Sequence, residues 1–135
     1  MTLQVEFVSP ERILYSGEAD MVLARTQSGG EIAFLTGHAP FVGTLAIGKV
    51  RLRRADGQEE LFAVHGGFVE VQDNLVTILS DVAEQASSID VGRAREARSR
   101  AEEALRSAGD DEARVEAQEA LRRADLRLEV AEAGA

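Results

Sequence analysis

The spacing of apolar residues changes once along this 135-residue chain, around residues 87–94. Before that point, apolar residues alternate in short runs that Gly, Pro, Asp and Asn interrupt, which is typical of β-strands. After it there is no Pro, and small apolar residues recur every three or four positions, which predicts α-helices. The change therefore predicts a β domain over residues 1–85 and a helical domain over residues 86–135.

The β domain is expected to be an antiparallel β-sandwich, or flattened barrel, built from short and evenly spaced strands. Such a sheet folds on itself to bury one face and to protect its edges. Asp56-Gly57 favours a tight hairpin, whereas Gly17 and Gly48 are expected to end strands and Gly66-Gly67 to join two of them. The predicted strands are 3–8, 13–15, 21–24, 31–35, 42–47, 49–53, 61–64, 68–71 and 75–79.

The helical domain is expected to be an antiparallel α-helical hairpin. Asp90 is placed to cap the first helix, and Gly109-Asp110-Asp111 supplies a helix end followed by a new cap. Alanine seams bury little apolar area, so the hairpin is either a mobile element or a permanently docked coiled hairpin. The two predicted seams are Ala94, Ala97, Ala101, Ala104, Leu105 and Ala108, and Ala113, Ala117, Ala120, Leu121, Ala124, Leu128 and Ala131.

Composition excludes several functional classes. The chain has no Cys, and neither His38 nor His65 has a neighbouring Ser-Asp pair or second ligand, so we expect no enzyme active site, no metal site and no required cofactor. The net charge of −9 argues against nucleic-acid binding, which requires a concentrated basic surface. No apolar run is long enough to span a bilayer, so we expect a soluble protein that can still dock on a membrane assembly.

Four segments, in order and with matching spacing, resemble a known family. They are Gly30-Glu31-Ile32-Ala33-Phe34-Leu35-Thr36-Gly37-His38-Ala39-Pro40-Phe41-Val42, Leu45-Ala46-Ile47-Gly48, Gly66-Gly67-Phe68-Val69-Glu70-Val71 and Asn74-Leu75-Val76-Thr77-Ile78-Leu79. Together with the helical hairpin that follows, they resemble the epsilon subunit of bacterial-type F-type ATP synthases. Ala33 and Thr36 stand where that family usually has Gly and Pro, which affects the local loop conformation only.

The resemblance implies a non-catalytic rotor subunit of the central stalk in a proton-translocating ATP synthase. Its partners would be the gamma subunit, the c-subunit ring and the alpha and beta subunits. The sandwich would dock on the shaft and the ring, with Glu31 and His38 near the ring, and the hairpin would inhibit ATP hydrolysis. Such a subunit is a peripheral membrane protein on the cytoplasmic side of the cell membrane.

The segment Ile89-Asp90-Val91-Gly92-Arg93-Ala94 has the form Ile/Leu-Asp-x-x-Arg-Ala, which in ATP-binding members of the family holds the adenine side of one ATP. The resemblance therefore implies ATP as a regulatory ligand. An alternative is that Asp90 is only a cap and the arginines only solvate the hairpin, which would make the chain a purely structural coupling or adaptor module. The implied ATP-binding residues are Glu84, Ile89, Asp90, Arg93, Ala94, Arg100, Arg123 and Arg127.

Overall fold

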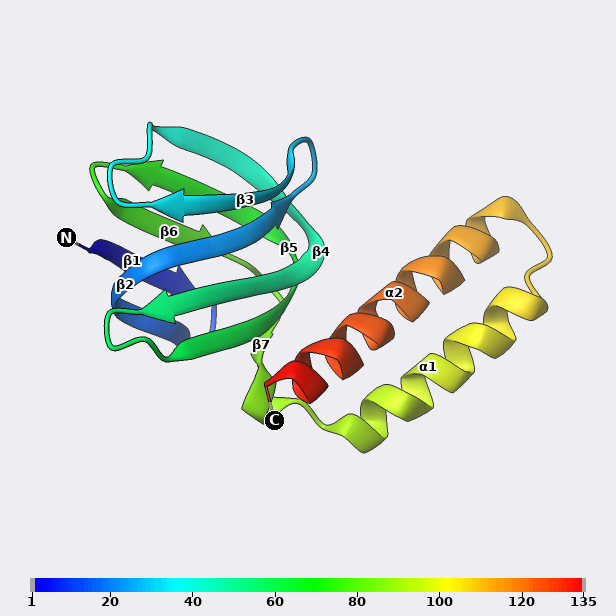
Figure 1. Ribbon diagram of the computed structural model, residues 1–135. Helices are drawn as coiled ribbons and strands as arrows, with labels where there is room; N and C mark the ends of the chain where they lie inside the picture. The colour runs from blue at the N-terminus through cyan, green and yellow to red at the C-terminus, as the bar shows by residue number, and fades with distance from the viewer. Residues whose placement is uncertain (1, 135) are drawn as a thin grey trace. The chain divides into compact units, whose positions relative to one another are not determined.

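The computed structural model describes residues 2–134 of the chain. It divides into two compact units, Met1–Gln85 and Ala86–Ala135. Strands make up the first unit and helices the second (Figure 1). We refer to them as the sandwich unit and the hairpin unit.

The sandwich unit is one seven-stranded sheet that closes on itself (Figure 1). The strands follow the order β1-β6-β5-β4-β2-β3, and an additional β1–β2 pairing completes a ring, so the predicted flattened barrel is confirmed. Every pairing is antiparallel except that of β1 with β6, which is parallel. The strands are β1 Leu3–Val8, β2 Ile13–Thr26, β3 Gly30–Leu35, β4 Phe41–Arg54, β5 Glu59–Gln72, β6 Leu75–Leu79 and β7 Ala83–Gln85.

The interior of the barrel is filled by alternate residues of its strands. Phe7, Phe34 and Phe62 are the largest of the fully buried side chains. The rings of Phe7 and Phe62 meet with their centroids 4.8 Å apart, in a tilted arrangement. Burial of each such side chain contributes roughly 1.5–3 kcal/mol, so these aromatic residues anchor the core.

The predicted strand breaks at three glycine positions are wrong. Strands β2, β4 and β5 are each 14 residues long and run through Gly17, Gly48 and Gly66-Gly67 respectively. The aliphatic part of Arg25 packs over Gly48, close to the β-carbon that any other residue would carry. These glycines bend long strands around a closed barrel, a role that sequence alone does not distinguish from a turn.

The hairpin unit begins with a 3-10 turn, η1 (Ala86–Ser88), which precedes α1 (Val91–Arg106) and α2 (Asp111–Ala133). The predicted caps are confirmed, because Asp90 Oδ1 accepts from Arg93 N at 3.1 Å and Asp110 Oδ1 accepts from Ala113 N at 2.7 Å. The two helices run antiparallel, as Figure 1 shows. The carboxylates satisfy N–H groups that have no partner within the first helical turn.

The predicted alanine seams describe only part of the helix burial. Ala94 and Ala101 of α1 are buried, and so are Ala117 and Ala124 of α2, but Ala108 lies beyond the end of α1. Leu126 and Val130 of α2 are also buried, although the predicted seam omits them. At 100° per residue they fall on the other side of the helix from Ala117 and Ala124, so α2 buries side chains on two faces.

Candidate functional site

A groove of about 560 Å³ runs between the two helices of the hairpin unit. Its floor is made of the small side chains of the alanine seams, which leave space where larger residues would close the interface. Arg100 of α1 and Arg123 and Arg127 of α2 line it. The full lining is Ala97, Arg100, Ala101, Ala104, Ser107, Ala108, Gly109, Ala113, Glu116, Ala117, Ala120, Arg123 and Arg127.

The charge of this groove is positive, in a protein that is acidic overall. Glu116 is the only acidic residue among the described residues that line it, against three arginines. Within the described part of the chain, no ion pair joins Arg100 or Arg123 to an acid. Arg98, by contrast, pairs with Asp125 at 3.1 Å. Arg100 and Arg123 can therefore form charge-assisted hydrogen bonds with an anionic ligand.

The residues of the Ile89–Ala94 motif lie at the start of α1 and outside the lining of this groove. Asp90 and Arg93 are exposed, whereas Ile89 and Ala94 are buried. The carboxylate of Asp90 caps the helix through the backbone of Arg93, which leaves the Arg93 side chain without a part in the cap.

Glu84 belongs to β7 of the sandwich unit, opposite Ala63 of β5. Its Oε1 lies 3.5 Å from Nε2 of His65. Of the eight predicted ATP-binding residues, the groove therefore brings together Arg100, Arg123 and Arg127. The other five lie elsewhere in the two units.

The two predicted ring contacts do not form one cluster. Glu31 is near the start of β3, where it pairs with Arg25 at 3.6 Å, and His38 follows the end of the same strand. The His38 ring packs edge-to-face on Phe34, with the centroids 4.9 Å apart, and its Nδ1 is 2.7 Å from the carbonyl oxygen of Ala39. The length of β3 separates the two side chains, so any partner that contacts both must extend along this edge strand.

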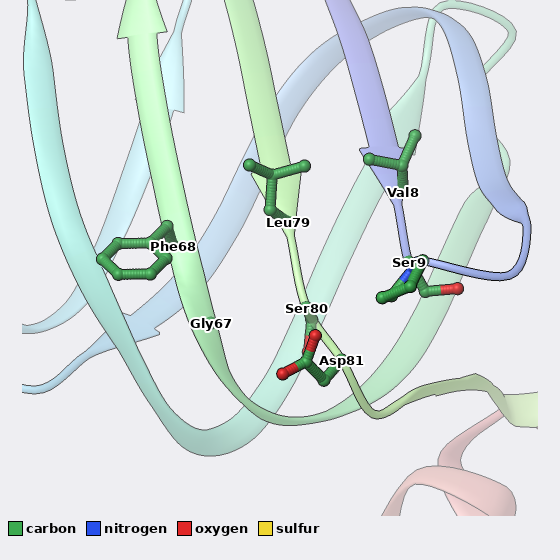
Figure 2. Close-up of a pocket in the computed structure, with 8 residues that line it drawn as sticks. Val8, Ser9, Gly67, Phe68, Leu79, Ser80 and Asp81 are labelled. Atoms are coloured by element: carbon green, nitrogen blue, oxygen red, sulfur yellow. The ribbon is translucent and has the colours of Figure 1, made fainter.

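An apolar patch on the outside of the sandwich unit was not predicted. It consists of Val8, Val42, Phe68 and Leu79, of which Val42 is 72% and Phe68 56% exposed. Register places Leu79 directly beside both Val8 and Phe68, and Figure 2 shows these three side chains on neighbouring strands. The sequence contained one hint of this patch. Phe68 and Glu70 are two residues apart on β5, so the large aromatic side chain shares a strand face with an acidic, exposed one.

Residues 2–134 form neither a candidate metal site nor a membrane-spanning helix. No three His, Asp or Glu side chains in this range are grouped as metal ligands. Among the helices of that same range, none has the length and apolar character needed to cross a membrane.

Comparison with protein families shows that both units match one kind of protein. Residues 2–86 match the β-sandwich domain of the ATP synthase delta/epsilon chain, and residues 87–132 match its long α-helix domain. The fold and these matches define the chain as a member of the ATP synthase delta/epsilon family. The resemblance inferred from the four sequence segments is thus confirmed.

Individual relatives narrow the comparison to epsilon chains. The chain is 47% identical over 130 residues to the ATP synthase epsilon chain of Bacillus velezensis, covering 96% of this chain and 97% of the relative. It is 50% identical over 110 residues to that of Priestia megaterium, covering 82% and 81%. A chain of the Euglena gracilis mitochondrial ATP synthase shares the fold with a TM-score of 0.83 at 23% identity, covering 97% of this chain and 81% of that one.

Proposed function

We propose that the chain is a non-catalytic rotor subunit in the central stalk of a proton-translocating F-type ATP synthase, and that its hairpin binds ATP as a regulatory ligand. The proposal of ATP binding is supported by the groove between the two helices, which Arg100, Arg123 and Arg127 line. Its volume of about 560 Å³ falls in the usual range for small-molecule sites.

The triphosphate would bind to the groove arginines. Each charge-assisted hydrogen bond contributes roughly 1.5–3 kcal/mol, and an arginine can offer two in parallel to one phosphate. Arg123 and Arg127 are four residues apart on α2 and so project from the same side of the helix as neighbours. Two helices thus supply cations to one ligand only when they are packed against each other.

The remaining predicted residues would contact the adenosine side. Asp90 uses one carboxylate oxygen for the cap, and a carboxylate can accept further hydrogen bonds, including those of the adenine amino group. We assign Glu84 the same kind of contact and Arg93 a contact with the phosphates. Ile89 and Ala94 would bound the base with apolar surface.

The proposed regulation follows from the difference in affinity between two states of the hairpin. A ligand that needs both helices packed together stabilises that state and no other. ATP would therefore favour the compact hairpin, and ATP depletion would favour an extended hairpin that reaches the alpha and beta subunits and inhibits hydrolysis. A seam built largely from alanine suits such a switch, since its apolar contacts are small.

The sandwich unit would attach the chain to the rest of the rotor. The apolar patch formed by Val8, Val42, Phe68 and Leu79 would dock on the gamma subunit, because exposed apolar surface of this kind marks protein interfaces. Glu31 and His38 would face the c-subunit ring. The chain would then lie at the cytoplasmic side of the cell membrane, held there by the complex and without a cofactor of its own.

An arginine pair on α2 supplies the test of ATP binding. Arg123 lines the groove, whereas the adjacent Arg122 is exposed and does not. In calorimetric titrations with ATP, Arg123→Ala should weaken binding about tenfold or more, as should Arg93→Ala, because each loses about 1.4 kcal/mol or more. Arg122→Ala removes the same charge and should change affinity less than about threefold. Absence of ATP binding by the wild-type chain would leave the structural coupling module as the function.

The same preparations test whether the chain has an active site. We expect no ATP hydrolysis by the isolated protein, because the chain lacks a P-loop with its Lys and Ser/Thr. Turnover that persists through purification and is lost in a single-residue variant would contradict this.

A further inference from the structure

A pocket of about 260 Å³ opens within the apolar patch of the sandwich unit. Val8, Phe68 and Leu79 give it apolar walls, and Asp81, just after the end of β6, adds a carboxylate to its lining (Figure 2). We propose that this pocket takes one large apolar side chain of the gamma subunit, and that a lysine or arginine beside that side chain pairs with Asp81. The proposal rests on the proposed docking of the patch on gamma, and it specifies the chemistry of the docked segment.

The walls of the pocket belong to one row of side chains across neighbouring strands. Leu79 of β6 is directly beside Val8 of β1 on one side and Phe68 of β5 on the other. Val8 in turn lies opposite Ile13 of β2. Ile13 is 67% exposed and Leu79 50%, so the row leaves apolar surface in water across four strands. Continuous apolar surface of this kind is typical of a protein interface.

The volume of the pocket limits the size of the group that can enter it. An apolar cavity of about 150 Å³ is enough for a benzene ring. A pocket of about 260 Å³ is therefore large enough for one side chain of the size of leucine, methionine or phenylalanine. Side chains that fill such a pocket near the centre of an interface commonly contribute most of its binding energy.

The backbone around Asp81 is held in place on both sides. The neighbouring Ser80 is 4% exposed, and its hydroxyl donates to the carbonyl oxygen of Gly66 at 2.6 Å. The N–H of Ser80 donates to the last residue of β1 at 3.2 Å, and the carbonyl oxygen of Val82 accepts from the N–H of His65 at 3.0 Å. The segment that carries the carboxylate is thus ordered before any partner binds, which lowers the cost of binding.

The charge around the pocket is negative. Asp81 is exposed, and within residues 2–134 no ion pair joins it to a cation. Beside the apolar row, Glu6 and Glu70 both lie next to Thr77 of β6, and neither pairs with a cation of the described residues. The β1–β2 turn adds one acid and one base, whose charges balance. A partner with a basic residue next to its apolar side chain is therefore attracted here, and an acidic one is repelled.

The apolar part of the proposal is tested by calorimetric titration of the full-length protein with the gamma subunit of the same synthase. Leu79→Ala removes one wall of the pocket and should weaken binding about tenfold or more. Leu75→Ala is the matched control, because Leu75 is 40% exposed on the same face of β6 but lies outside the lining of the pocket. It should change the affinity less than about threefold.

The charged part is tested by Asp81→Asn, which removes the charge with little change of size. At about 0.05 M salt this variant should bind about threefold to tenfold more weakly than the wild type, and at about 1 M salt, where charges are screened beyond about 3 Å, the difference should largely disappear. The effect of Leu79→Ala should persist at both salt concentrations. Asp73→Asn changes the same charge in the β5–β6 turn, at the other end of β6, and should leave the affinity within about twofold of the wild type.

The outcomes separate this proposal from the proposed function. If gamma binds and either Leu79→Ala or Asp81→Asn has the affinity of the wild type, the proposal is overturned, while docking on gamma stands. Wild-type dimers that Leu79→Ala separates would make a second copy the occupant and would also overturn it. If Leu79→Ala does not fold, as circular dichroism would show, the exposed Asp81 still decides. If the wild type does not bind gamma, the proposed docking itself fails, and this proposal fails with it.

Discussion

Replacing Gly67 by Ala tests whether the bend in β5 holds the sandwich unit together. Gly67 has φ +133°, a conformation that L side chains rarely adopt. An added β-carbon would fall on the carbonyl oxygen of Leu79, well inside van der Waals contact, and 3.0 Å from the α-carbon of Ser80. Both obstacles are backbone at the end of β6, so relief requires β5 and β6 to separate.

The expected loss is large for a unit of this size. The backbone conformation costs about 1–3 kcal/mol for a residue other than Gly, and the overpacking about 1–3 kcal/mol more. The free energy of unfolding should therefore fall by about 2–6 kcal/mol, out of roughly 4–13 kcal/mol for a unit of this length. At about 4–8 °C per kcal/mol, the melting temperature should drop by at least about 8 °C.

The assay is urea unfolding followed by the fluorescence of Tyr15, the only tyrosine in a chain without Trp. Gly57→Ala is the matched control, because Gly57 also has positive φ (+88°) but its β-carbon would meet nothing within 4 Å. It should lose only about 1–2 kcal/mol. Equal stabilities of the two variants would refute the close approach of β5 to β6 as the reason for Gly67.

Three other experiments test the cap of α1, the independent folding of the sandwich unit and the burial of Tyr15. Asp90→Ala should lower the stability of α1 by about 1 kcal/mol, seen in the thermal melt of the far-ultraviolet circular dichroism, and Asp90→Asn should restore most of it; unchanged melting of Asp90→Ala would contradict the cap. Deletion of residues 90–135 should leave a folded barrel with a cooperative unfolding transition. If the amide NMR signals of the truncated protein instead show the narrow dispersion of an unfolded chain, the sandwich unit does not fold independently. Burial raises the pKa of the Tyr15 hydroxyl, and the charge of Arg54 partly opposes this rise. The neutral tyrosine therefore stabilises the fold below about pH 10, the pKa of the unfolded chain. This contribution to stability is lost as the pH rises through the higher pKa of the folded state. The tyrosinate absorbance should accordingly appear at higher pH in the folded protein than in urea, and coincident titrations would argue against burial as the cause.

Features set by a few neighbouring residues were predictable from the sequence. The helix starts at Asp90 and Asp110 depend on a side chain that bonds to an N–H three residues ahead. The Asp56-Gly57 hairpin depends on a positive φ that Gly adopts without strain. The spacing of apolar residues also changes near residue 90, and this change separates strands from helices. It was predictable because each spacing reflects the local backbone geometry of a strand or a helix.

Features that depend on pairing between distant segments could not be predicted from the sequence. The parallel β1–β6 pair joins the first strand of the sandwich unit to one near its end, and nothing in either sequence identifies the other as its partner. The apolar patch needs three strands in register before Val8, Phe68 and Leu79 become neighbours.

The candidate site divides in the same way. ATP binding was implied only by the resemblance of Ile89–Ala94 to a motif of the family, because the arginines by themselves fit a solvated helix face as well. That Arg100 shares a groove with Arg123 and Arg127 depends on the packing of α1 against α2, and that His65 lies 3.5 Å from Glu84 depends on the pairing of β5 with β7. Sequence determines which groups a chain carries, whereas distances between groups far apart in it exist only once the tertiary contacts have formed.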